Sequence, residues 1–301
     1  MTAERTASVV VPVLNGAETI GDLLTALANQ VGAPRDVEVL VVDNGSTDRT
    51  AAIVGGYPVA LLHESRPGPS AARNRGLAQA RGEVVVFADA DTLPTRRWLA
   101  ELLAPFADPA TVVAGGHAVD YRPTTAAERF MAQLGVHRLE YEFFRARVPY
   151  VAAESMAVRR TALLAVGAWD ETFRTAEDLD VCVRLVRRYG CRVLRQPAAV
   201  LFSRRRPTFE ALFAQAWNYG QGLGQARLRY PEVIPLTPSR CLRLGHTLAL
   251  RGATAAWCAG ARRGGLATAE RSAFARHHWD WSRAFWGGFG SMLRHRAWRE
   301  R

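Results

Sequence analysis

Two aspartates, Asp89 and Asp91, follow an apolar run at 84–87 and are separated by one small residue. The β-branched run is typical of a buried strand. Carboxylates this close together raise the cost of ionising each other unless a cation relieves the repulsion. Hard divalent cations take oxygen ligands and often combine one or two carboxylates with substrate phosphates. The spacing therefore indicates a Mg²⁺ or Mn²⁺ site, and the structural alternative is a pair of turn aspartates before a helix near residue 95.

A second acidic pair, Glu177 and Asp178, precedes apolar residues at helical spacing: Leu179, Cys182, Val183 and Val186. A carboxylate in the first turn of a helix gains about 0.3–1 kcal/mol from the helix dipole. A side chain kept ionised in this way suits a general base. Ordinary acidic chemistry at a helix start is the alternative.

Polar residues also follow an apolar run at 37–42, where Asp43 and Asn44 begin the segment DNGSTD. The amide oxygen of Asn44 can accept a hydrogen bond from the N3–H of uracil or thymine, and its NH₂ group can donate to a carbonyl. An Asx-turn before a short helix is the alternative.

The elements that must position these residues alternate through residues 7–119. Apolar runs predict strands at 7–13, 37–42, 59–62, 83–87 and 111–115, and the intervening segments predict helices at 18–31, 48–55, 70–81 and 95–107. This alternation predicts an α/β fold with a mostly parallel, doubly wound, Rossmann-like sheet that has helices on both faces. Ligands of such sheets bind beyond the carboxyl ends of the strands, which is where the polar segments fall.

Residues 120–238 are less regular, and we expect them to complete the same domain and close over its edge. Helices are expected at 125–147, 177–189 and 207–229, and a strand at 192–195.

Residues 239–301 are expected to form a basic, Trp-rich helical tail. They carry 12 Arg against 3 acidic residues and hold five of the eight tryptophans: Trp257, Trp279, Trp281, Trp286 and Trp298. The longest uncharged stretches in this tail are ten residues, about half of what a membrane-spanning helix requires. Helices lying on an anionic membrane surface would explain Arg interleaved with Trp. A basic extension that packs on the body of the protein or on another subunit is the alternative.

The composition narrows the class of protein. The chain has 301 residues, of which 49% are hydrophobic and 22% charged, as in an ordinary globular protein. All 39 basic residues are Arg, which is typical of a GC-rich genome. No nucleic-acid-binding motif accompanies the charge, so no nucleic-acid partner is expected. The four cysteines lack zinc-site spacing and the first residues lack a signal-peptide pattern, which predicts a cytoplasmic protein, at most peripheral on the inner face of the plasma membrane.

Five segments in order resemble family 2 glycosyltransferases of the GT-A fold, bacterial and actinobacterial members in particular: SVVVPVLNGAETI, VVDNGSTDRT, GPSAARNRGLAQARGEVVVFADADT, VGAWDETF and EDLDVCVRL. The resemblance covers residues 7–225. It implies transfer of a sugar from a UDP, dTDP or GDP donor, with inversion at the anomeric carbon, to an acceptor alcohol that is lipid-linked, a small glycan or a natural product. Residues 1–119 would then be the nucleotide-sugar-binding half of one domain and 120–238 its acceptor-binding half.

The resemblance also implies roles for individual residues. Asp178 matches the family's catalytic aspartate, Glu177 would orient the acceptor, and Asp89 and Asp91 would bind the metal. Arg73 would support the base and ribose, and its guanidinium can hold Asp43 or stack on a ring. The donor would be bound by Pro12, Asn15, Asp43, Asn44, Arg73, Asp89 and Ala90.

Two departures from the family pattern matter. Many relatives carry histidine where this chain has Phe202 and Ser203. Either Asp91 and phosphate oxygens alone hold the ion, or the diphosphate charge is taken up directly by Arg204, Arg205 and Arg206. The Gln-x-x-Arg-Trp motif of processive members is absent, which predicts transfer of one sugar per encounter.

Two other functions remain open at this point. A nucleotidyltransferase is built on a related sheet, but it would need a Gly-rich basic loop after the first strand, and residues 12–20 have one Gly and no basic residue. A degenerate transferase-like protein that only binds a membrane or a partner is the other alternative. The presence of Asp89, Asp91 and Asp178 together argues against it.

Overall fold

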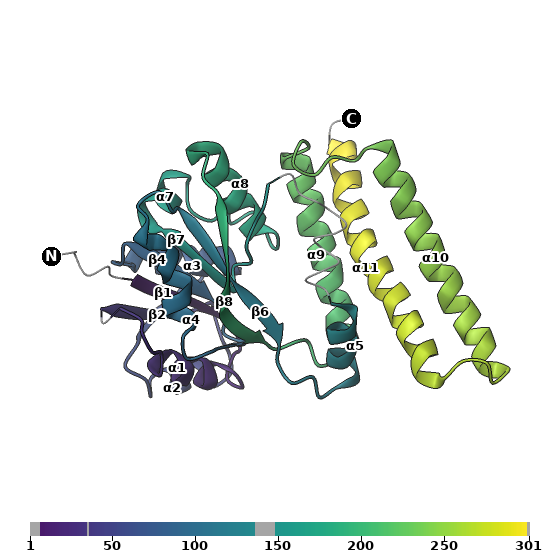
Figure 1. Ribbon diagram of the computed structural model, residues 1–301, viewed down its shortest axis with the longest axis horizontal. Helices are drawn as coiled ribbons and strands as arrows, with labels where there is room; N and C mark the ends of the chain where they lie inside the picture. The colour runs from purple at the N-terminus through teal and green to yellow at the C-terminus, as the bar shows by residue number, and fades with distance from the viewer. Residues whose placement is uncertain (1–6, 35, 136–147, 300–301) are drawn as a thin grey trace. The chain divides into compact units, whose positions relative to one another are not determined.

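The computed structural model describes residues 7–34, 36–135 and 148–299. The chain divides into two compact units: unit 1 is Met1–Tyr121 with Val148–Arg204, and unit 2 is Arg122–Arg147 with Arg205–Arg301 (Figure 1). This division differs from the boundaries at 119 and 238 that the sequence suggests. The helical run that begins after residue 207 groups with the C-terminal helices and not with the sheet.

Unit 1 is built on one eight-stranded sheet with the order β3-β2-β1-β4-β7-β6-β8-β5. Its strands are β1 (Ala7–Val13), β2 (Val37–Asp43), β3 (Ala60–His63), β4 (Val84–Ala88), β5 (Thr92–Pro94), β6 (Val113–Asp120), β7 (Ser155–Arg159) and β8 (Val193–Ser203). Strands β3, β2, β1 and β4 are mutually parallel, as predicted, and β6 is parallel to β8. Only β7 and β5 pair antiparallel with their neighbours. The carboxyl ends of six strands therefore meet at one edge of the sheet.

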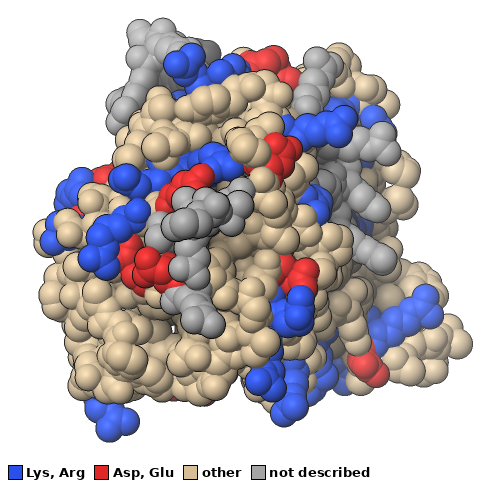
Figure 2. Space-filling model, turned by 60° about the vertical axis from the view of Figure 1, so that its left-hand side comes forward, with Lys and Arg blue, Asp and Glu red and all other residues tan. Residues whose placement is uncertain are grey.

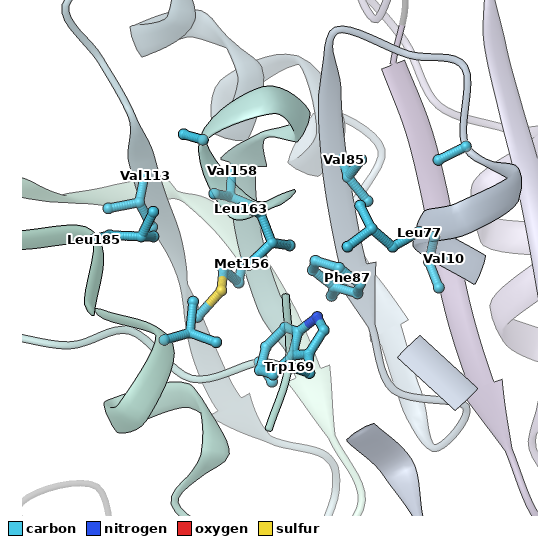
Figure 3. Packing of buried hydrophobic residues seen from close by; sticks show 14 of the residues in the cluster. Val10, Leu77, Val85, Phe87, Val113, Met156, Val158, Leu163, Trp169 and Leu185 are labelled. Carbon is cyan, nitrogen blue, oxygen red and sulfur yellow. The ribbon is translucent and has the colours of Figure 1, made fainter. Parts of the chain in front are cut away.

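Helices cover both faces of this sheet, because its central strands are apolar on both sides. One face packs against α3 (Pro69–Gln79), α7 (Arg160–Ala165) and α8 (Glu177–Tyr189), with the buried cluster shown in Figure 3. The other face packs against α1 (Ile20–Ala28), α2 (Thr50–Val54), α4 (Trp98–Leu103) and the short 3₁₀ helix η1 (Ala104–Ala107). The predicted two-sided architecture is confirmed.

Three details of unit 1 differ from the sequence-based expectation. The three-residue strand β5 and the six-residue helix α7 are too short to show a periodic pattern. Strand β8 extends to Ser203, well beyond the predicted 192–195. Pro197 interrupts the apolar run there, and the ladder between β6 and β8 is irregular at this point, with partners passing from Arg195 to Val200.

Unit 2 is helical and contains α5 (Ala126–Leu134), α9 (Phe209–Arg229), α10 (Pro238–Arg263) and α11 (Ala269–Arg299). Helix α5 covers the start of the predicted 125–147 helix, and residues 136–147 lie outside the described residues. Figure 1 shows α11 between α9 and α10. Among the described residues, no helix combines the length and the apolar character needed to span a bilayer.

Helices α9 and α11 approach so closely that glycine is required at their contact. A Cβ on Gly220 of α9 would lie 1.8 Å from the carbonyl oxygen of Phe285, and a Cβ on Gly288 of α11 would lie 2.1 Å from that of Trp217. The backbones of the two helices are therefore in direct contact within unit 2.

Candidate active site

The candidate site lies where the strands of the parallel half end. The ladder between β1 and β4 stops at the pair Val10–Phe87. Pro12, two residues further along β1, has no N–H group with which to extend a ladder. The two strands are therefore free to separate at their carboxyl ends, which is where doubly wound sheets bind ligands.

The two aspartates of the DAD segment lie in a tight turn at this edge. The backbone N–H and the hydroxyl of Thr92 both donate to the carbonyl oxygen of Asp89, at 3.1 and 2.8 Å. Ala90 lies beside the loop after β1, since a Cβ on Gly16 would be 3.7 Å from its Cβ. The Asp89 side chain is 36% exposed and Asp91 is half-buried. Both carboxylates are therefore accessible from the edge.

Arg73, on α3, joins the two acidic pairs that the sequence singles out. Its Nη2 donates to Oδ1 of Asp89 at 2.9 Å, and its Nη1 donates to Oε1 of Glu177 at 2.6 Å. The Arg73 side chain is 3% exposed. Burial alone would lower the pKa of a guanidinium, but the charges of these two carboxylates raise the pKa of Arg73 above its ordinary value. The sequence suggests Asp43 or a base as partners of Arg73, and the structure pairs it with Asp89 and Glu177.

A turn anchored by Trp169 brings the start of α8 to this site. Trp169 is buried, packs edge-on against Phe87 with ring centroids 4.9 Å apart (Figure 3), and lies 5.0 Å from the guanidinium carbon of Arg73. Asn74 of α3 holds the turn from both sides, because its Oδ1 accepts from the N–H of Trp169 and its Nδ2 donates to the Trp169 carbonyl, at 3.0 and 2.9 Å. Helix α3 therefore positions both the arginine and the turn that leads to α8.

Asp178 lies in the first turn of α8, directly after the Arg73-bound Glu177. It is half-buried, and its Oδ1 accepts the N–H of Leu179 at 2.8 Å. The residue before the helix, Ala176, has a left-handed backbone with a φ of 64°. This left-handed conformation produces the sharp turn after which the helix starts at Glu177. For a residue with a side chain it costs on the order of 1 kcal/mol, which the surrounding contacts must offset.

The loops after β1 and β2 are tied together by hydrogen bonds. The Oδ1 atom of Asn15 accepts from the N–H of Thr47 at 2.8 Å, and the N–H of Asn15 donates to the hydroxyl of Ser46 at 2.9 Å. Asp43 is 5% exposed and accepts from the N–H of Ser46 at 2.9 Å. These contacts fix two of the residues expected to bind a donor, Asn15 and Asp43. Pro12, a third, lies within β1 opposite Val42 of β2.

Asn44 has a different environment from the one the sequence suggests. Its Nδ2 donates to the carbonyls of Glu64 and Arg66 at 2.9 and 2.7 Å, and its Oδ1 accepts from the N–H of Gly68 at 2.8 Å. Both N–H bonds of the amide are therefore used to hold the loop that leads into α3. Neither N–H group of the Asn44 side chain is then available to donate a hydrogen bond to a base.

That loop contains an ion pair that sequence reasoning missed. Glu64 is buried and accepts from the backbone and side chain of Arg66. The Arg66 hydrogen bonds lower the pKa of Glu64 to about 2. Arg66 also pairs with Glu171, 2.8 Å away in the Trp169 turn. The segment HESRPG at the end of β3 indicates a polar loop, but nothing in it identifies Arg66 as the partner of Glu64 and Glu171.

The three arginines after β8 fall on different sides of the unit boundary. Arg204 is in unit 1, where its N–H donates to the carbonyl of Asp91 at 3.2 Å, its guanidinium carbon lies 4.9 Å from the ring centroid of Tyr121, and its Nη2 pairs with Asp22. Within the described chain its buried Nη1 has no hydrogen-bond partner. Arg205 and Arg206 belong to unit 2.

The oxygen ligands of Asp89 and Asp91 fit a hard divalent cation. Arg73 occupies Oδ1 of Asp89, which leaves the other oxygen of a partly exposed carboxylate. Over the described residues, no group of three or more His, Cys, Asp or Glu side chains is arranged to hold a metal. A cation bound here would therefore take further ligands from phosphate or water, which is how Mg²⁺ commonly binds.

The family model and the most similar curated proteins agree on one family. The family model described as Glycosyl transferase family 2 matches residues 8–167. A pre-mycofactocin glycosyltransferase of Mycobacterium tuberculosis is 31% identical over 239 residues, which cover 76% of this chain and 49% of the relative. Glycosyltransferase AglE of Haloferax volcanii is 36% identical over 131 residues, 41% of this chain and 43% of the relative. The chain therefore matches about half the length of these curated relatives.

Solved structures share the fold. Mannosyltransferase PcManGT from Pyrobaculum calidifontis, in complex with GDP-Man and Mn²⁺, has a TM-score of 0.65 at 23% identity, covering 95% of this chain and 88% of that one. Glucosyl-3-phosphoglycerate synthase from Mycobacterium tuberculosis, in complex with Mn²⁺, UDP and glucosyl-3-phosphoglycerate, has a TM-score of 0.56 at 23% identity, covering 78% and 82%. These likenesses establish the GT-A fold that the sequence predicts.

Proposed function

The chain belongs to glycosyl transferase family 2, and we propose that it transfers one sugar per encounter from a nucleoside diphosphate sugar to an acceptor hydroxyl, with inversion at the anomeric carbon and with the assistance of a divalent metal. The observation that carries this proposal is the Arg73 bridge between Asp89 and Glu177. It joins the expected metal-binding and acceptor-binding segments, which are far apart in the sequence.

The donor nucleoside would bind along the loops after β1 and β2. Asp43 and Asn15 are held there by hydrogen bonds within the protein, so their positions need not change when a ligand arrives. Leu14 is 59% exposed and offers an apolar surface to a base. Because the amide of Asn44 is engaged with the loop before α3, we assign it the role of shaping this pocket. The donor is proposed to be a UDP-, dTDP- or GDP-sugar.

The diphosphate would bind between Asp89, Asp91 and Arg204. A Mg²⁺ or Mn²⁺ ion held by the two aspartates would offset the negative charge of the diphosphate as it leaves. Arg204 would contribute charge at the same turn, since its backbone N–H donates to Asp91. Its Nη2 is paired with the exposed Asp22, and its buried Nη1 has no hydrogen-bond partner within the described chain. This favours the second of the two arrangements left open by the missing histidine, in which arginine takes up part of the phosphate charge.

The transfer step requires one proton acceptor. The acceptor oxygen attacks the anomeric carbon from the side opposite the diphosphate, its proton passes to a carboxylate oxygen of Asp178, and the electrons of the breaking carbon–oxygen bond leave with the diphosphate. Attack from the opposite side inverts the anomeric configuration. Glu177, fixed by Arg73, would orient the acceptor, and assistance by such a base is worth about 10²–10⁴-fold in rate.

The acceptor is proposed to be a lipid-linked alcohol, a small glycan or a natural product. We also propose that the protein works at an anionic membrane surface through residues 239–301, whose excess of Arg supports electrostatic attraction to lipid.

A panel of UDP-, dTDP- and GDP-sugars, tested by thermal shift with and without Mn²⁺, examines the donor and metal sites together. A donor present at about 100 times its Kd stabilises the folded state by about 2.7 kcal/mol. We expect one base to raise the melting temperature, and we expect EDTA or the variant Asp91→Asn to remove most of that rise. If no nucleotide sugar stabilises the protein in the presence of metal, the proposed donor site is wrong.

A further inference from the structure

Helix α10 packs mainly against α11 and presents its opposite face to solvent. Its buried residues are Cys258 and Ala261. Helix α11 lies between α9 and α10, so α10 has a neighbouring helix on one side (Figure 1). A helix at the edge of a soluble bundle is expected to carry polar residues on its outer face.

The outer face of α10 is apolar instead. Leu242, Leu250 and Trp257 are 77%, 54% and 55% exposed. Together with the exposed His246 and Ala253, they recur four, four, three and four residues apart, which places them on one side of a helix with 3.6 residues per turn. We call these five residues the α10 face. Exposed Leu and Trp aligned over four turns are unusual on a surface that has no partner.

The charged residues of α10 itself have one sign. No Asp or Glu occurs between Glu232 and Glu270 in the sequence, whereas Arg243, Arg262 and Arg263 of α10 are exposed. Arg243 directly follows Leu242 and so lies at the border of the α10 face. An apolar stripe on a helix whose charged residues are all arginine is complementary to a bilayer, which is apolar inside and anionic at its surface.

The other described tryptophans of the tail are buried or half-buried, whereas Trp257 is 55% exposed and has the guanidinium carbon of Arg271, in α11, 5.7 Å from its ring centroid. Trp281 is 5% exposed and stacks on Phe285 with ring centroids 5.3 Å apart, and Trp286 packs against Phe289. Trp279 is half-buried beside Gly252 of α10. The side chain of Trp298 lies outside the described residues. Among the described tryptophans of residues 239–301, Trp257 is therefore the one that is exposed enough to enter a membrane interface.

We infer that the α10 face is a docking surface for an anionic lipid bilayer, with α10 lying in the plane of the interface. Leu242, Leu250 and Trp257 enter the boundary between headgroups and acyl chains, and the arginines contact lipid phosphates. Small residues such as Ala253 let the helix approach the bilayer closely. The α10 face thus rests on and refines the proposed membrane association of residues 239–301. It does not depend on the proposed catalytic residues, because all residues that form it belong to unit 2.

The test is cosedimentation of the full-length chain with vesicles of phosphatidylcholine alone or mixed with an equal amount of phosphatidylglycerol. We expect binding to the mixed vesicles and little binding to phosphatidylcholine. The double variant Leu250→Ser/Trp257→Ser should reduce binding at least tenfold. Arg243→Glu should reduce binding more than fivefold and make it less sensitive to salt, because each arginine near an anionic surface contributes about fivefold.

Two control variants make the same chemical change elsewhere. Leu164→Ser removes an exposed leucine from α7, and Arg188→Glu reverses an exposed arginine of α8. Both should bind vesicles as the unchanged protein does, and circular dichroism and donor binding should show that all variants are folded.

Equal binding of the α10 variants and the controls would overturn the inference, as would the absence of binding to anionic vesicles. Sedimentation velocity distinguishes the other occupant of the face. If the unchanged protein is a dimer without lipid and Leu250→Ser/Trp257→Ser is a monomer, the α10 face binds a second copy of the chain and the inference is wrong. Failure of either kind leaves the donor thermal shift unchanged, so it does not bear on the proposed transfer reaction.

Discussion

Replacing Arg73 by methionine tests whether its buried cation holds the candidate site together. The substitution keeps the side chain long and apolar but removes the charge between Asp89 and Glu177. Removing one partner of a buried ion pair typically costs 3–5 kcal/mol, because the remaining charge is left without compensation. Here Glu177, whose side chain is 11% exposed, bears most of that cost. Asp89 is 36% exposed and can be rehydrated, so its share is small.

The lost contact with the Trp169 ring adds about 1 kcal/mol. Because Asp89 can be rehydrated, the ion-pair cost lies at the lower end of its range, and we expect Arg73→Met to lower the free energy of unfolding by about 4 kcal/mol in total. Transfer activity should fall below detection. Arg73→Lys keeps the charge but not the forked geometry that reaches two carboxylates, and it should be intermediate.

The assay is urea unfolding at neutral pH followed by circular dichroism, with the m-value used to check that unfolding remains two-state. Arg81→Met is the matched control, because Arg81 is 85% exposed and pairs with Glu38 on the surface. Arginine and acidic side chains lie next to one another on the face shown in Figure 2, and surface pairs contribute about 0–1 kcal/mol. If Arg73→Met costs no more than Arg81→Met, the bridge does not stabilise the fold.

A double variant separates the two contributions. Arg73→Met/Glu177→Gln removes the uncompensated carboxylate as well as the cation, and it should be about 1–2 kcal/mol more stable than Arg73→Met alone. A double variant that is less stable than either single variant would refute the reasoning that charge burial dominates.

Three further predictions concern other parts of the chain. Asp178→Asn should keep donor binding in the thermal shift assay but reduce transfer by at least about 10²-fold, with Glu101→Gln unchanged, and normal turnover would remove Asp178 from the mechanism. The pKa of Glu64 is lowered to about 2, so its contribution is present at neutral pH and lost as the pH falls from about 5 to 2; acid titration of stability should show about 1 kcal/mol less loss in Glu64→Gln. Gly220→Ala places a Cβ 1.8 Å from a backbone oxygen and should cost about 2–3 kcal/mol, whereas Gly245→Ala, with nothing within 4 Å, should stabilise α10 by about 0.5–1 kcal/mol; equal melting temperatures would contradict the close helix contact.

The parallel half of the sheet could be predicted because its signals are local. Strands β1, β2 and β4 are continuous apolar runs, and the polar segments that follow them must lie at the same edge once the strands are parallel. Strand β8 could not be predicted in full, because Pro197 breaks the local pattern and only pairing with β6 shows that the strand continues.

The positions of Asp89 and Glu177 could be predicted separately, but the bond that joins them could not. The chain has 39 arginines and 28 acidic residues, and nothing in their spacing indicates which arginine is buried. Arg73 lies on a helix whose inner face carries Asn74 as well, so α3 lacks the apolar stripe that identifies a core-facing helix. The polar inner face is explained only by what lies opposite it: the Trp169 turn and the two carboxylates.

The same contacts explain why the candidate site should need little rearrangement on binding. Asn74 fixes the Trp169 turn, Arg66 ties that turn to the loop before α3, and Arg73 ties the first residue of α8 to the end of β4. Asp178 is the next residue of α8, within a regular helical turn, so the proposed base can move relative to the proposed metal-binding segment only if several of these contacts break. A protein that holds its acid and base groups in this way has met the ordering cost of the site during folding, and binding energy from the donor remains available for the transfer step.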